Sequence, residues 1–211
     1  MNYPVQQGPW TVKQLITDYL SWDLPRRIKG FRDAWQMDDV RLPTPTHYLA
    51  YEPPALDEWP TVITVQMSTS RIQRIDYTGG LNPVYRCTYN LRTFVWVNHE
   101  FAPEATEARD RLTAVVRASL LDRPCLEKGT DHDGHQLLLD ESTMREEYSE
   151  ITYVKGHRAV AGAYLSYDVS TDEVITRANL GEVSEIDARF DALGRNGGDD
   201  VPNVLTRIVT D

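Results

Sequence analysis

The stretch "VYRCTYNLRTFVWVN", Val84–Asn98, decides the fold of this chain, together with the segment that follows it. From Tyr85 to Arg92 apolar and polar side chains alternate, which is the period of a β-strand with one buried face. The run Phe94–Val97 is apolar at every position. We therefore expect the second half of the strand to be buried on both sides, as in a central strand.

The segment after this strand predicts a long amphipathic helix, "EATEARDRLTAVVRASLL". Pro103 suits the first helical position, Glu104 suits the positive end of the helix dipole, and Pro124 ends the pattern. Glu107 and Arg111 form a favourable i,i+4 pair. Small and apolar residues recur at steps of three and four, which predicts one buried face made of Ala105, Ala108, Leu112, Val115, Val116, Ser119 and Leu120.

The first 59 residues have a different character. "TVKQLITDYL" predicts a helix with Thr11 as its N-cap, and a second short helix is expected at about Arg26–Trp35. The proline-rich stretch Arg41–Pro60 predicts an extended connector with one edge strand near Tyr48. We therefore expect residues 1–59 to form a helical and proline-rich extension, residues 60–180 the core domain, and residues 181–211 a C-terminal arm or tail.

Other segments give shorter signals. "TVITVQM", Thr61–Met67, predicts a strand, "HQLLL" a short strand, and "DESTMREEY", Asp140–Tyr148, a short acidic helix or turn. "EITYVKGHRAVAGAYLSYDV" predicts either a hairpin that turns near Gly156 or one long strand with a bulge there.

The charge of the chain argues against nucleic-acid binding. Its 32 acidic and 22 basic residues give a net charge of −10, and no stripe of Lys or Arg could neutralise DNA phosphates. An acidic surface suits a protein that DNA passes without specific binding. The N-terminus lacks the pattern of a signal peptide, and no apolar run is long enough for a membrane span, so we expect no membrane contact.

"DHDGH", Asp131–His135, is the segment that most resembles a metal site. Its ligand types crowd around a glycine without the spacing of a zinc site or an EF-hand loop, so we interpret it as a solvated loop. Cys87 and Cys125 also lack metal-site spacing, which favours a reduced, intracellular setting. We identify no catalytic, cofactor-binding or metal-binding residues, and expect an interaction or assembly protein and not an enzyme.

The pattern from residue 60 onward resembles the tail terminator family of long-tailed bacteriophages, which are head-to-tail joining proteins of the virion neck. The resemblance covers about half of the chain. Four segments carry it in order: "PTVITVQM", "YRCTYNLRTFVWVN", "EATEARDRLTAVVRASLL" closing on "DRPCL", and "YSEITYVKGHRAVAGAYLSYDV".

This resemblance implies an α+β fold, a mixed β-sheet flanked by helices with irregular N- and C-terminal extensions, that assembles into a hexameric ring. The ring would be made in the host cytoplasm and would cap the tail tube in the virion. Its implied partners are other copies of the chain, the tail tube protein and the head-to-tail connector or adaptor protein, while genomic DNA passes through. The resemblance implies no cofactor and no catalytic residues.

The segment "AVAGAYLSY" is the candidate subunit interface. Small residues would allow close backbone approach and two tyrosines could anchor a neighbour, which gives the candidates Ala159, Ala161, Ala163, Tyr164 and Tyr167. An ordinary intramolecular strand is the alternative for this segment. Alternative functions are another connector or stopper protein of the phage neck, a metal-dependent hydrolase that uses the "DHDGH" loop, or a small ligand-binding domain.

Overall fold

The computed structural model describes residues 8–53, 59–75, 83–122, 126, 137–154 and 158–174. All these residues fall within one compact unit, Met1–Ile175. The predicted arm over residues 181–211 lies outside the described residues. Within the described ranges the chain forms two helices and six strands: α1 (Pro9–Trp35), β1 (His47–Leu49), β2 (Thr61–Arg74), β3 (Val84–His99), α2 (Ala102–Asp122), β4 (Leu138–Tyr148), β5 (Thr152–Val154) and β6 (Arg158–Val174).

The strands form one sheet in the order β1-β2-β3-β6-β4, and β5 pairs with β6 beyond the end of β4. β1 and β2 run parallel, and the other neighbours run antiparallel. The sheet is therefore mixed, and the predicted α+β fold is confirmed. β3 lies between β2 and β6, as expected for a central strand.

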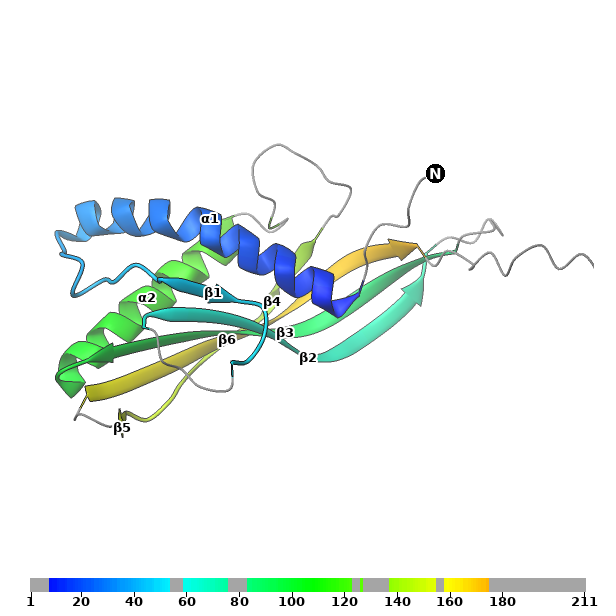
Figure 1. Cartoon of the computed structure of the whole chain (residues 1–211). Coiled ribbons are helices and arrows are strands. Elements are labelled where there is room, and N and C mark those ends of the chain that lie inside the picture. The colour runs from blue at the N-terminus through cyan, green and yellow to red at the C-terminus, as the bar shows by residue number, and fades with distance from the viewer. Residues whose placement is uncertain are drawn as a thin grey trace, which may run out of the picture. The chain divides into compact units, whose positions relative to one another are not determined.

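Burial along β3 differs from the prediction in its second half. Leu91, Val95 and Val97 are buried, but the intervening Phe94 and Trp96 are only partly buried. Both helices lie on the same side of the sheet (Figure 1), so the described helices cover only one face of β3. The expectation of burial on both sides is wrong for this reason.

Helix α2 packs its predicted face against β3 and β6. All seven residues expected on that face are buried. The predicted i,i+4 pair is present, with Arg111 Nη2 2.5 Å from Glu107 Oε1. Amphipathic spacing alone was sufficient for this element.

Helix α1 is one continuous helix, so the prediction of two short helices is wrong. It begins after Gly8, whose φ of 96° favours glycine, with Pro9 at its first position, so Thr11 is not the N-cap. Pro25 lies inside the helix, where a proline costs about 3 kcal/mol. Burial of each leucine-sized side chain contributes about 1.5–3 kcal/mol, and the fully buried residues of α1 are Ile16, Tyr19, Leu20, Leu24 and Ile28.

Helix α1 therefore belongs to the hydrophobic core and is not an extension outside it. A partly buried polar network also ties it to α2. The Asp23 carboxylate accepts hydrogen bonds from Ser119 Oγ at 2.6 Å and Arg27 Nε at 2.7 Å, and Arg27 also reaches Asp122 at 2.8 Å. Because each of these side chains has a hydrogen-bond partner in the network, the network fixes how the two helices pack.

Strands β2 and β4 are longer than predicted. β2 continues past Met67 to Arg74, with register irregularities at Gln66/Ser68 and Thr69/Arg71. β4 includes the whole "DESTMREEY" segment, so the predicted acidic helix or turn is wrong. A bulge between Asp140 and Arg145 allows β4 to pair with β6, and Thr143 Oγ1 accepts a hydrogen bond from the Asp168 N–H at 2.8 Å. Pairing with β6 has outweighed the local sequence preference.

Two smaller predictions are confirmed. The edge strand near Tyr48 is β1, and the segment around Gly156 joins β5 to β6 as an antiparallel hairpin. The turn itself, residues 155–157, lies outside the described residues.

Candidate assembly interface

The sheet face opposite the helices, here called the open face, changes character along its length. At one end the residues of β3 and β6 that lie opposite each other are Trp96 with Gly162 and Phe94 with Tyr164. Towards the other end the pairs on the same face become polar: Asn90 with Asp168, Thr88 with Ser170, and Arg86 with Asp172. The open face thus has an aromatic end and a polar end.

Four side chains form what we call the aromatic row: Trp59, Trp96, Phe94 and Tyr164. Neighbouring ring centroids in the row lie 6.4, 6.5 and 5.3 Å apart. All four residues are only partly buried. Trp96 lies so close to the backbone of Gly162 that a Cβ atom there would overlap its ring. The sheet therefore presents a continuous aromatic surface that no described helix covers.

Arg92 ends the aromatic row with a positive charge. Its guanidinium carbon lies 4.6 Å from the centroid of the Tyr164 ring, a favourable cation–π geometry. A hydrogen bond to Glu147 of β4 raises the pKa of the Tyr164 phenol, while the Arg92 charge opposes that shift. Arg92 Nε is buried and has no hydrogen-bond partner among the described residues.

The polar end of the open face is held by cross-strand hydrogen bonds. Arg86 makes a bidentate pair with Asp172 at 2.8 and 3.0 Å, and Asn90 Nδ2 donates to Asp168 at 2.9 Å. Each such pair contributes about 0.2–1 kcal/mol to sheet stability. These side chains already have partners in their own chain.

The residues predicted for the subunit interface divide between the two faces of β6. Ala159, Ala161, Ala163 and Tyr167 are buried on the helix side, where a neighbouring chain could not reach them. Burial raises the pKa of Tyr167, whose hydroxyl lies 2.7 Å from Thr93 Oγ1. Tyr164 alone of the five is partly exposed, on the open face. The two-residue period of a strand could have separated Tyr164 from the other four.

Both long edges of the sheet lack a strand partner within the described ranges. β1 pairs only with Thr61–Ile63 of β2, so the backbone of Thr64–Arg74 has no described strand partner on that side. The outer side of β4 likewise has no strand partner among the described residues. The sequence did not predict these edges, because the expected strand ended at Met67 and Asp140–Tyr148 was expected to form an acidic helix or turn.

Two surface clefts stand out. One, of about 470 Å³, lies along α1 and is lined by Asp23, Arg26, Arg27, Gly30, Phe31 and Ala34. The other, of about 230 Å³, includes His99, whose Nδ1 lies 3.2 Å from Glu104 Oε2. Ligand pockets usually exceed about 300 Å³, so this cleft offers little room. Its lining residues are Asp39, Val40, Pro43, Pro60, Val97, Asn98, His99 and Ala108.

The described ranges contain no group of three or more metal-ligating side chains. The "DHDGH" segment, Asp131–His135, lies outside the described residues, and so does Cys125. The metal-dependent hydrolase therefore stays an untested hypothesis. Cys87 is buried, and this burial raises the pKa of its thiol.

No family model matches the chain, and no curated protein matches it at a significant level. Neither helix in the described part of the chain is long and apolar enough to span a membrane.

Proposed function

We propose that this chain is a structural protein of a bacteriophage virion, a tail terminator that forms a hexameric ring. The ring caps the tail tube and joins it to the head connector. The observation that carries the proposal is the incomplete cover of the sheet. One face packs on α1 and α2, whereas the aromatic row and both long edges have no covering element among the described residues.

A closed ring needs two different and complementary surfaces on each subunit, because each copy contacts its two neighbours through different patches. The two edges of the sheet, along β2 and β4, are different surfaces of one subunit. The aromatic row is a third, partly exposed surface, and apolar groups that gather at a surface commonly mark protein contacts. A ring subunit between a tail tube and a connector needs contacts of all these kinds.

The net charge of −10 fits the passage of genomic DNA through the ring. Like charges on the protein and the phosphate backbone disfavour adhesion, so DNA can move past without specific binding. The proposed protein partners are the tail tube protein and the connector or adaptor protein, and the proposed location is the neck of the virion after assembly in the host cytoplasm.

Light scattering combined with negative-stain imaging of the purified chain tests the proposal. The expected result is a ring-shaped species with six times the mass of one chain. When this species is added to polymerising tail tubes, the tubes should stop growing. Rings that bind head-side connectors and leave tail-tube length unchanged would favour the alternative connector or stopper protein. A monomer that affects neither assembly would overturn the proposal.

A further inference from the structure

The geometry points to a specific contact within the ring: the outer edge of β2 in one copy pairs antiparallel with the outer edge of β4 in the next copy. This inference rests on the proposed ring and identifies the two surfaces that close it. A continuous sheet would then run from subunit to subunit.

The two edges match in length. β4 has 11 residues, and the part of β2 beyond its pairing with β1, Thr64–Arg74, has the same length. Unpaired backbone N–H and C=O groups along an edge strand readily accept another strand. An exposed long edge is otherwise a liability in solution, so two matching edges on one chain favour a contact that covers both.

The strand directions also match. β2 runs antiparallel to β3, β3 to β6, and β6 to β4, so β2 and β4 run in opposite directions within one subunit. Rotation about an axis along the strands preserves these directions in every copy. The β2 edge of one copy therefore meets the β4 edge of the next with antiparallel polarity, which is the more stable pairing.

The charges on the two edges are opposite. Thr64–Arg74 contains two arginines and no acidic residue, whereas β4 contains four acidic residues and one arginine. An antiparallel overlap shifted by one residue from full overlap places Arg71 of β2 opposite Asp140 of β4, which keeps the open-face residues of both strands on one face. Complementary charges of this kind select the partner and the register.

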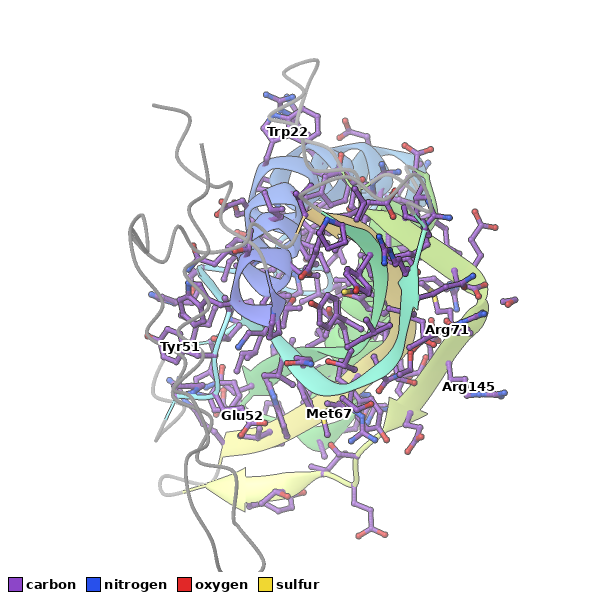
Figure 2. All side chains as sticks on the ribbon, turned by 90° about the vertical axis from the view of Figure 1, so that its right-hand side faces the viewer. Trp22, Tyr51, Glu52, Met67, Arg71 and Arg145 are labelled. Carbon is purple, nitrogen blue, oxygen red and sulfur yellow. The ribbon has the colours of Figure 1, made fainter. Side chains whose placement is uncertain are left out.

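One like-charge contact on β4 would be relieved by this pairing. Asp140 lies directly opposite Asp168 of β6 on the open face, and two carboxylates opposite each other are unfavourable. Arg71 also lies on the open face, opposite Thr88 of β3. In the next copy its guanidinium can therefore approach Asp140. Figure 2 shows Met67 and Arg71 on β2 and Arg145 on β4.

Exposed apolar side chains line both edges. On β2, Met67 and Ile72 are 47% and 64% exposed, and on β4, Leu138 and Tyr148 are 43% and 49% exposed. Covering these side chains removes apolar surface from water, which favours association. The charges would then set the direction and the apolar groups would strengthen the contact.

Charge exchange tests the contact, with assembly followed by light scattering over a range of concentrations. Arg71→Glu and Asp140→Arg should each raise the concentration of half-assembly by about tenfold or more, because each places like charges together. The double variant carrying both changes should return it to within about threefold of the wild type. Lys29→Glu is the control, because it makes the same charge change as Arg71→Glu at an exposed position of α1, and it should have no effect.

Thermal melting checks that each variant folds. Asp140 Oδ1 also accepts hydrogen bonds from the Ser142 N–H at 3.0 Å and from Ser142 Oγ at 2.6 Å, so Glu141→Arg replaces Asp140→Arg if the latter variant does not fold. If rings form only on tail tubes, the same comparison is made there. If the wild type assembles and each single variant assembles equally well, the edge contact is overturned, while the proposal of a ring stands. A wild type that never assembles, with or without tubes, would overturn both proposals.

Discussion

The two halves of β2 have opposite environments within one strand. Thr61–Val65 is buried at every position, whereas Ser68–Arg74 is exposed at every position. The isoleucines make the contrast plain, since Ile63 is 3% exposed and Ile72 is 64% exposed. In Figure 1 the second half of β2 runs with β3 and β6 beyond the start of α1. The first half stabilises the fold, and the second half is available for contacts outside the subunit.

The largest effect should follow removal of the layer that covers the first half. Deletion of Met1–Pro43 removes α1 and its fully buried side chains, and exposes the helix side of the sheet to water. We expect the cooperative thermal transition to disappear in calorimetry. If the deletion variant melts cooperatively, with a melting temperature within a few degrees of that of the full chain, α1 is an extension outside the core, as the sequence predicted.

A matched pair of substitutions measures the contrast within β2 itself. Ile63→Ala should lower the free energy of unfolding by about 2–5 kcal/mol because it leaves a cavity. Ile72→Ala should change it by less than about 0.5 kcal/mol because the side chain is mostly in water. Urea denaturation of the two variants gives both values, and equal losses would contradict the proposed division of the strand.

A smaller effect is expected where Trp96 contacts Gly162. Gly162→Ala forces the indole away from β6, and overpacking of this kind costs about 1–3 kcal/mol. The double variant Gly162→Ala/Trp96→Ala tests the cause, because without the ring the alanine meets no obstacle. If the glycine substitution has the same cost in both backgrounds, the ring is not responsible for it.

The smallest effect is expected at the polar end of the open face. Arg86 and Asp172 form a bidentate pair, but their side chains are 47% and 43% exposed. A double-mutant cycle with alanine should give a coupling free energy of about 0.2–1 kcal/mol, which falls as salt is added. A coupling free energy above about 2 kcal/mol would contradict the expectation that this exposed pair contributes little to the stability of the sheet.

The sequence was most informative where one period dominated. The three- and four-residue steps of α2 and the alternation in β3 identified the buried faces of both elements. Two predictions were wrong because tertiary packing outweighed local signals. Helix α1 continues through Pro25 as one helix, and the acidic segment Asp140–Tyr148 belongs to a strand that pairs with β6.

The candidate interface was less predictable than the fold. Exposure depends on which sheet face the helices cover, and no short segment carries that information. The choice of "AVAGAYLSY" combined residues from both faces, so it joined Tyr164 with four residues of the core. The open edges were not recognised because neither strand boundary was predicted correctly.

Hydrogen exchange of the backbone amides, compared between the monomeric and assembled fractions, tests the division of the sheet most directly. Amides of Thr61–Val65 should exchange slowly in both fractions because they lie in the core. Outward-pointing amides in Gln66–Arg74 and Leu138–Tyr148 should exchange rapidly in the monomer, and at least about tenfold more slowly in the assembly. Unchanged rapid exchange along both edges in the assembled protein would contradict the account.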